Sequence, residues 1–309
     1  MAKIFIDGSA GTTGLRIRER LAARKDLELI LLSEQMRKDT EARKDALNRA
    51  DVAFLCLPDA AAIEAVSLVE NPSTAIIDTS TAHRTMSGWE YGFPELAGRR
   101  EKIAASKRIA NPGCHASGFV ALVAPLVQAG ILRPNVKLTA YSITGYSGGG
   151  KKMIAEYEDA ERDCLLDAPR MYGLSQTHKH LPEMKVIGGL QVEPIFCPVV
   201  APFYSGMEVT VPLFAEDLTG DCNVETISDF YRGYYQGGTI RFASSADESG
   251  FLSAAAFSGR DDMQISVFGN KDRILLVARF DNLGKGASGA AIQNMNILLG
   301  CDETAGLVL

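Results

Sequence analysis

The sequence predicts an α/β protein with two parts: a doubly wound, Rossmann-like domain and an α+β domain with a mixed sheet. Four observations predict this. A glycine-rich loop separates the first apolar run from the first helical pattern, and apolar runs and helical patterns then alternate over the first third of the chain. Apolar runs dominate much of the remainder. At 309 residues, the chain is long enough for two domains.

The composition, 46% hydrophobic and 23% charged, is that of an ordinary globular protein. A net charge of -6 argues against a nucleic-acid partner, which would favour a basic surface. No apolar run approaches the roughly 20 residues of a transmembrane helix, so we expect a cytoplasmic protein with no membrane partner. The six cysteines are scattered without CxxC pairs, a pattern that fits neither a disulfide framework nor a zinc site.

The first predicted strand, residues 3–7, leads into a GxxGxxG loop and then into a helix. Glycines permit tight turning and a close approach of the backbone to a pyrophosphate at the helix N-terminus. Alone, such a loop can also be a turn without a ligand, so the prediction depends on the alternating pattern that follows. The loop residues that we assign to the cofactor are Gly8, Ser9, Gly11, Thr12, Thr13 and Gly14.

That pattern continues with predicted strands at residues 27–32, 52–57 and 75–78 and with helices at 39–49 and from Asp59. After the second strand, Ser33 and Arg37 suit the 2′-phosphate of NADP, whereas Glu34 leaves NAD open. Arg37 could also be a solvated surface charge. We expect NADP as the cofactor.

Cys114 lies at the start of a predicted helix whose apolar residues fall on one face as far as Gly130. The N-H groups and the positive end of the dipole at a helix start favour a thiolate, and those N-H groups could also hold an oxyanion. Cys114 is therefore a candidate nucleophile. The alternative is a small buried hydrophobic residue, which we assume for the other five cysteines.

A cysteine nucleophile needs a base, which can lie far away in sequence. His178 and His180 are the only close pair of histidines. Metal binding by this pair lacks further ligands at a suggestive spacing, and histidines satisfied by local hydrogen bonds are the simpler alternative. Lys151 follows three glycines after an apolar run at 137–143, without the Walker A spacing. It is a candidate partner for a substrate phosphate or carboxylate, or part of an exposed flexible loop.

Four segments together resemble the N-acetyl-gamma-glutamyl-phosphate reductases: Asn111–Cys114, Gly145–Lys151, His178–Glu183 and Asp281–Asn296. The length is similar to that of the shorter, type 2 members, and the resemblance spans the chain. This sequence has His115 where a tyrosine usually follows the cysteine, and a lysine at 151 where many members have arginine. Arginine binds anions with a bidentate geometry that lysine lacks, which leaves the anion contact at this position open.

The resemblance implies NADPH-dependent reduction of N-acetyl-L-glutamyl 5-phosphate to N-acetyl-L-glutamate 5-semialdehyde in L-arginine biosynthesis. Cys114 would form a thioester with release of phosphate, and His180 would be the acid/base. The substrate residues that the resemblance implies are Arg84, Asn111, Lys151, His178 and Glu183. The further cofactor residues that it implies are Pro58, Ser80, Ser147, Gly148, Asn282, Lys285 and Asn294. The last three would lie near the nicotinamide.

By the same resemblance, a final helix from about Lys285 folds back onto the cofactor domain. We expect residues 1–114 and 285–309 to bind the dinucleotide and residues 115–284 to form the catalytic, substrate-binding and dimerisation domain of a homo-oligomer, either a dimer or a tetramer. The apolar runs of that second domain predict a mixed or antiparallel sheet. The predicted strands are at 137–143, 207–214, 264–268 and 273–280, and a helix is predicted at 224–235.

Two other functions compete with this one. An aspartate-semialdehyde dehydrogenase would share the glycine loop, the cysteine and the Asn-Leu-x-Lys-Gly run, but the His-Lys-His-Leu-Pro-Glu motif disfavours it. A non-catalytic NADP-binding regulator is disfavoured because Cys114, His180 and Lys151 are all retained.

Overall fold

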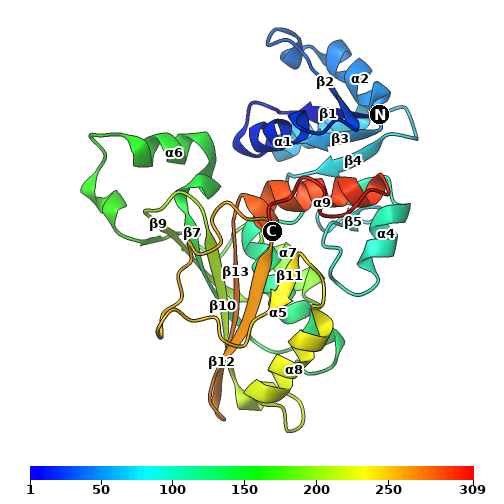
Figure 1. Cartoon of the computed structure of the whole chain (residues 1–309). Coiled ribbons are helices and arrows are strands. Elements are labelled where there is room, and N and C mark those ends of the chain that lie inside the picture. Colours follow the sequence, from blue (N-terminus) through cyan, green and yellow to red (C-terminus); the bar gives the residue numbers. More distant parts are fainter. The chain divides into compact units, whose positions relative to one another are not determined.

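The computed structural model describes all residues from Met1 to Leu309, and the chain divides into two compact units (Figure 1). The first unit consists of Met1–Gly113 and Ala287–Leu307, and the second of Cys114–Gly286 and Val308–Leu309. None of the helices combines the length and the apolar character that crossing a membrane requires.

A parallel sheet of six strands forms the centre of the first unit, in the order β2-β1-β3-β4-β6-β5. Its strands are β1 (Ala2–Asp7), β2 (Leu27–Ile30), β3 (Val52–Leu55), β4 (Ala75–Asp78), β5 (Glu90–Tyr91) and β6 (Arg108–Ala110). The strand order reverses between β1 and β3, and in doubly wound sheets the carboxyl ends of the strands at such a point form the ligand crevice. The predicted fold class of this part is confirmed.

Helices cover both faces of this sheet. The helices of the first unit are α1 (Thr12–Ala22), α2 (Thr40–Arg49), α3 (Asp59–Ser67), α4 (Arg99–Ala105) and α9 (Gly289–Leu298), with a short 3-10 turn, η1 (Met36–Lys38). Side chains alternate between the faces of a strand, so Phe54 packs in one core cluster with α1 and α9, whereas Leu55 packs in another with α2 and α3. The last helix thus completes one face of a sheet made by the first residues.

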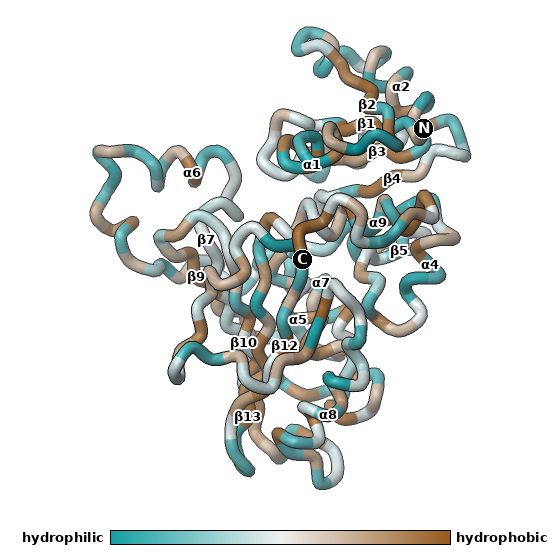
Figure 2. Tube along the Cα trace, in the orientation of Figure 1, coloured by the Kyte–Doolittle hydropathy of each residue, from teal (hydrophilic) through white to brown (hydrophobic).

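The second unit is built on a mixed sheet of seven strands, in the order β11-β12-β13-β10-β7-β9-β8. Its strands are β7 (Thr139–Gly145), β8 (Arg170–Met171), β9 (Ile195–Ala201), β10 (Met207–Phe214), β11 (Ile240–Phe242), β12 (Met263–Gly269) and β13 (Arg273–Phe280). The trace along β10 and β13 is largely apolar (Figure 2). Most neighbours are antiparallel, but β7 and β9 run parallel, and so do β11 and β12, which makes the sheet mixed, as predicted.

A long helix, α5 (Cys114–Gln128), packs closely on this sheet. A Cβ at Gly118 would lie 2.6 Å from Val209 and 2.8 Å from Phe280, so a glycine is required where the helix meets β10 and β13. The remaining helices are α6 (Gly150–Glu158), α7 (Leu181–Ile187) and α8 (Val224–Tyr234). The shorter turns are η2 (Tyr146–Gly149), η3 (Cys164–Asp167), η4 (Ala215–Asp217) and the π turn η5 (Gly284–Ser288).

Several predicted elements have different ends in the structure. The strand predicted at residues 27–32 stops at Ile30, where its pairing with β1 also stops. The strand predicted at 137–143 begins at Thr139, its first paired residue. The final helix predicted from about Lys285 begins as the π turn and becomes α-helical at Gly289.

Candidate active site

The loop between β1 and α1 requires glycine at two positions. Gly8 has a φ of +84°, and a Cβ there would lie 2.2 Å from the carbonyl oxygen of Cys56. A Cβ at Gly14 would lie 2.5 Å from the carbonyl oxygen of Gly8. Gly11 closes the turn by donating its N-H to that same carbonyl at 3.0 Å, and no side chain caps α1. The N-H groups of the first helical turn are therefore available to a phosphate.

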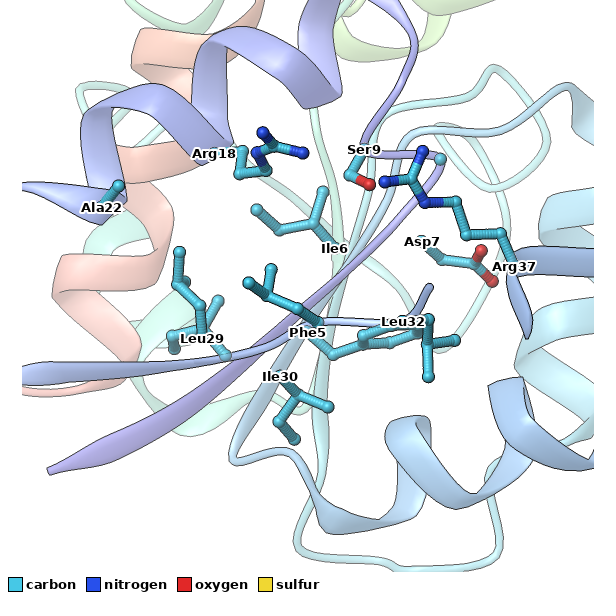
Figure 3. A pocket seen from close by; sticks show the side chains of 13 residues that line it. Phe5, Ile6, Asp7, Ser9, Arg18, Ala22, Leu29, Ile30, Leu32 and Arg37 are labelled. Atoms are coloured by element: carbon cyan, nitrogen blue, oxygen red, sulfur yellow. The ribbon is translucent and has the colours of Figure 1, made fainter. Parts of the chain in front are cut away.

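A pocket lies beside β1 and β2, next to this loop (Figure 3). Ser9, Arg18 and Arg37 line it, and the two guanidinium groups lie on the side where Ser9 lies. Neither arginine has an ion-pair partner, and Arg37 Nε is buried without a hydrogen-bond partner. Asp7 also lines the pocket, but it is paired with Arg43 at 3.0 Å. The pocket thus combines apolar walls with two positive charges that no carboxylate neutralises.

The carboxyl group of Asp7 is itself perturbed. Burial raises its pKa, and the hydrogen bond and charge of Arg43 oppose that shift. The Asp7 carboxylate forms its ion pair with Arg43 and not with Arg18 or Arg37. The positive charges of the two pocket arginines are therefore not neutralised by the acidic group at the end of β1.

Ser33 lies outside the lining of this pocket. It is exposed and does not line the pocket, and its Oγ accepts the N-H of Met36 at 3.4 Å. It therefore contacts the start of the short turn η1, which carries Arg37. Arg18 was not predicted from the sequence. The available signal was its position four residues after Gly14, which is one turn further along α1 from the glycine loop.

The loop after β4 is organised by the buried carboxylate of Asp78. It accepts a hydrogen bond from Ser80 Oγ at 2.7 Å and pairs with Nδ1 of His83 at 2.6 Å. Arg84 is buried and donates through Nε to the carbonyl oxygen of Asn111 at 2.9 Å. Ser80 and Arg84 therefore both contribute to the architecture of the strand ends in the first unit. Pro58 precedes α3 as its N-cap residue at the end of β3.

Asn294 ties the last helix to this region. Its Nδ2 donates to the carbonyl oxygens of Gly92 and Ala290, both at 2.9 Å. Asn111 Nδ2 donates to the carbonyl oxygen of Ala287 at 3.1 Å. The Oδ1 of Asn294 is buried and has no hydrogen-bond partner. A buried acceptor without a donor is costly, so this atom is suited to accept a hydrogen bond from a ligand amide.

In the second unit, Cys114 is the first residue of α5 and is partly exposed. The π turn η5 runs beside it: a Cβ at Gly286 would lie 3.0 Å from the Cβ of Cys114 and 3.1 Å from the carbonyl oxygen of Asp281. The sulfur thus lies at a helix N-terminus, where the dipole favours a thiolate, against backbone that has no side chain at the point of contact.

His115 is buried between two hydroxyl groups. Its Nδ1 lies 2.6 Å from Ser142 Oγ, and its Nε2 lies 2.6 Å from the hydroxyl of Tyr172. Burial first, and the charge of His178 second, lower the pKa of His115 to about 3. Burial, and then the charge of Cys114, raise the pKa of Tyr172. The ring of His115 is therefore neutral, and the phenol of Tyr172 is protonated, at neutral pH.

His178 and His180 gather around His115. The ring centroids of the predicted pair are 4.8 Å apart, and they lie 5.8 and 5.6 Å from that of His115. His178 Nδ1 accepts the backbone N-H of His180 at 3.2 Å. Glu183 is buried in the first turn of α7, directly after them. No group of three or more His, Cys, Asp or Glu side chains is placed to hold a metal ion.

Most of the remaining predicted residues of the second unit are buried or hydrogen-bonded to one another, whereas Lys151 is exposed and lies apart from the histidines. Asn282 Nδ2 donates to Ser147 Oγ at 3.0 Å, and a Cβ at Gly148 would lie 3.4 Å from the same nitrogen. Lys285 is buried in the π turn. Lys151, by contrast, is exposed in the first turn of α6, and no hydrogen bond or ion pair joins it to the histidines. Tyr172 and Ser142, which contact His115, were not predicted.

Each of the two units matches a known protein family model. The family model "Semialdehyde dehydrogenase, NAD binding domain" matches residues 3–106, and "Semialdehyde dehydrogenase, dimerisation domain" matches residues 114–282. Among solved structures, aspartate semialdehyde dehydrogenase II of Vibrio cholerae complexed with ASA has a TM-score of 0.73 at 18% identity, covering 97% of this chain and 98% of that one. The aspartate semialdehyde dehydrogenase of Candida albicans with NADP has a TM-score of 0.70 at 16% identity, with 97% and 98% covered. At these identities, the likeness shows the fold alone.

Sequence relatives are more specific. The N-acetyl-gamma-glutamyl-phosphate reductase of Brucella ovis is 49% identical over 306 residues, which cover 96% of this chain and 99% of that protein. The protein of the same name from Rhizobium meliloti is 48% identical over 305 residues, covering 96% and 98%. With this identity over nearly the whole length of both proteins, the chain belongs to the N-acetyl-gamma-glutamyl-phosphate reductase family.

Proposed function

We propose that this chain catalyses the NADPH-dependent reduction of N-acetyl-L-glutamyl 5-phosphate to N-acetyl-L-glutamate 5-semialdehyde, a step of L-arginine biosynthesis. The observation that carries the proposal is the placement of Cys114 at the first residue of α5, directly before His115, around which His178 and His180 gather. Membership of the family, at 49% identity to a reductase of that name, supports the choice of substrate.

The proposed reaction has two covalent stages on Cys114. His180 accepts the thiol proton, and the sulfur attacks the acyl carbon. The bond from that carbon to the phosphate oxygen breaks, and phosphate leaves with the proton from His180, so that a thioester remains. Bound NADPH supplies the hydride that reduces this thioester. When the carbon-oxygen double bond re-forms, the carbon-sulfur bond breaks, which releases the aldehyde and leaves a thiolate. A proton from water then restores the thiol.

Residues of the first unit fit a dinucleotide with a 2′-phosphate. The Gly8–Gly14 loop leaves room for a pyrophosphate, because side chains are excluded at its two ends. Arg18 and Arg37, unpaired in the pocket, would hold the 2′-phosphate, and the buried Oδ1 of Asn294 would accept a hydrogen bond from the carboxamide. These features support NADP rather than NAD. Pro58 and Ser80 would line the crevice at the strand ends.

The proposal also assigns roles to the other predicted site residues. Lys285 and the hydrogen-bonded group of Ser147, Gly148 and Asn282 would contact the cofactor. His178, Glu183, Lys151, Arg84 and Asn111 would contact or shape the binding site of the acyl phosphate. The match of residues 114–282 to a dimerisation domain supports a homo-oligomer, a dimer or a tetramer.

The reverse reaction tests the proposal. Purified protein would be given N-acetylglutamate semialdehyde, phosphate and NADP, and NADPH would be followed by its absorbance. Parallel reactions would contain aspartate semialdehyde in place of the acetylated aldehyde, or NAD in place of NADP. We expect phosphate-dependent NADPH formation with the acetylated substrate.

Two variants identify the nucleophile. Cys114→Ser should abolish turnover, whereas Cys222→Ser, at another partly exposed cysteine of the second unit, should retain it. Turnover of aspartate semialdehyde alone would contradict the substrate, and full activity of Cys114→Ser would contradict the thioester. No turnover of either aldehyde would favour a non-catalytic cofactor-binding protein.

A further inference from the structure

Arg43 is buried in the first unit, although arginine is mostly an exposed residue in proteins. It lies on α2, three residues before Ala46 and four before Leu47, which are both fully buried in a core cluster of the parallel sheet. Residues three and four positions apart share one face of a helix, so Arg43 belongs to the face of α2 that packs on the sheet. Its side chain is therefore held inside the protein, where a positive charge needs a partner.

Asp7 is that partner. It is the last residue of β1 and lies on the same face of the strand as Phe5, which belongs to the core cluster that α2 covers. Arg43 Nε donates to Asp7 Oδ2 at 3.0 Å, and Nη2 of the same guanidinium lies 3.0 Å from that oxygen. Glu64 lies further from Arg43, at 3.7 Å, and half of its side chain is exposed. The buried charge of Asp7 is thus matched by the buried charge of Arg43.

Asp7 lines the pocket that Arg18 and Arg37 also line, whereas Arg43 does not line it. Figure 3 shows the Asp7 carboxylate among the side chains of the pocket wall. A negative charge in this wall would repel a bound phosphate, but the ion pair of Asp7 with Arg43 carries no net charge. The ability of the pocket to bind an anion therefore depends on a residue that lies outside it.

We infer that Arg43 controls the affinity of this pocket for the phosphates of NADPH, because it neutralises the carboxylate of Asp7 in the pocket wall. Arg43 is a positioning residue, since it acts through Asp7 and does not itself line the pocket. The identity of the ligand rests on the proposed function. The ion pair and its charge balance are properties of the chain without substrate.

Two variants that break the same ion pair test this inference, because they leave opposite charges behind. Arg43→Met leaves the negative charge of Asp7 in the pocket wall and should weaken NADPH binding by about tenfold or more. Asp7→Asn leaves the positive charge of Arg43 behind that wall and should strengthen NADPH binding by about threefold or more. Fluorescence titration measures both affinities. If Arg43 only held α2 against β1, both variants would weaken binding, and this result would overturn the inference.

The double variant and a matched control complete the comparison. Asp7→Asn combined with Arg43→Met buries neither charge, so its NADPH affinity should return to within about threefold of the wild-type value. Arg49→Met is the control, because Arg49 is another arginine of α2 but is exposed, pairs with Asp45 at 2.9 Å and does not line the pocket. This variant should bind NADPH as the wild type does. An equal loss in Arg43→Met and Arg49→Met would contradict the role of the buried pair.

NADH provides a second comparison, because it lacks the 2′-phosphate. A charge in the pocket wall acts more strongly on the ligand with more negative charge, so Arg43→Met should weaken NADPH binding more than NADH binding. Equal losses for the two cofactors would indicate a local change of structure and would count against the inference.

Each single variant leaves a buried charge without its partner, which costs stability. Circular dichroism of every variant therefore precedes the titrations. If Arg43→Met does not fold, Asp7→Asn still decides the question, because the inference requires it to bind NADPH more tightly than the wild type does. An unchanged or lower affinity of Asp7→Asn would reject the charge balance.

Cofactor binding requires no turnover, so its outcome is independent of the reductase assay. An inactive wild-type protein whose two single variants shift NADPH affinity in opposite directions would contradict the proposed reaction and leave the role of Arg43 standing. An active wild type with unchanged affinity in both variants would contradict the role of Arg43 alone. If both hold, Arg43→Met should raise the KM for NADPH about tenfold or more with little change in kcat.

Discussion

A side chain at Gly8 would collide with the carbonyl oxygen of Cys56, because a Cβ there would lie 2.2 Å from that oxygen. The two chain segments are held together by the N-H of Cys56, which donates to the carbonyl oxygen of Asp7 at 2.8 Å. The ends of β1 and β3 therefore approach through backbone alone, and this close approach creates the edge of the Gly8–Gly14 loop.

We expect Gly8→Ala to destabilise the first unit and to weaken NADPH binding. The variant combines left-handed backbone strain with a steric collision. Gly98→Ala is the matched control, since Gly98 also has a positive φ, of +71°, but has no atom within 4 Å of an added Cβ. Chemical unfolding should show a loss in Gly8→Ala that exceeds the loss in the control by about 1–3 kcal/mol. Equal losses would show that strain alone matters.

The two arginines of the pocket that lack ion-pair partners should determine the preference for NADPH over NADH. Arg18→Met and Arg37→Met should each weaken NADPH binding by about tenfold or more, since a charged hydrogen bond contributes about 1.5–3 kcal/mol. NADH binding should change little. Lys38→Met, at an exposed residue next to Arg37 that does not line the pocket, is the control. Fluorescence titration of both cofactors measures the ratio, and a parallel loss of NADH affinity would contradict a 2′-phosphate contact.

His115 makes the stability of the protein depend on pH. Its pKa is about 3 in the folded chain, against an ordinary value of 6.5. Between these values the unfolded state binds more protons, so the contribution of neutral His115 is fully present above pH 6.5 and is lost as the pH falls towards 3. This one group should produce a slope of up to about 1.4 kcal/mol per pH unit.

Urea unfolding at several pH values between 7 and 4 measures this slope. His115→Gln should reduce it, because glutamine does not titrate. The groups that face His115 are Ser142, Tyr172, His178 and His180, and they remain in the variant. If the free energy of unfolding had the same pH dependence in wild type and variant, His115 would be excluded as the cause of the slope.

Gly286 should be sensitive to the smallest added side chain. In Gly286→Ala the new methyl group would lie 3.0 Å from the Cβ of Cys114 and 3.3 Å from the ring of Phe280, and crowding of this kind costs about 1–3 kcal/mol. We expect a lower unfolding midpoint and a changed rate of Cys114 alkylation. Gly233→Ala, inside α8 with open space around the added Cβ, should instead stabilise by about 0.5–1 kcal/mol. Similar behaviour of the two variants would contradict the contact at Cys114.

Strong local patterns made much of the fold predictable. The strands predicted at residues 207–214 and 273–280 have the same ends in the structure, because their apolar runs are long and clearly bounded. Strand β9 was not predictable, because it contains Pro198 and because its partners, β7 and β8, lie far from it in sequence. Short elements such as α4, α7 and β6 have too few residues to show a period.

The site was predictable where chemistry follows a motif, as at the glycine loop and at Cys114. It was not predictable where the chain brings distant residues together. Tyr172 lies 57 positions from His115, and Ser142 lies 27 positions from it, so no spacing rule connects them. Arg18 was missed because a single arginine on a polar helix face resembles an ordinary surface charge.

The order in which the ribosome adds residues has a consequence for the discontinuous first unit. Ile292 and Met295 of α9 are fully buried in the core cluster that also contains Ile4 and Phe54. That core cannot close until the last helix has been synthesised, although its strands were among the first residues to emerge. The second unit is contiguous apart from Val308 and Leu309, so nearly all of it is available for folding while the nascent first unit still lacks part of its core.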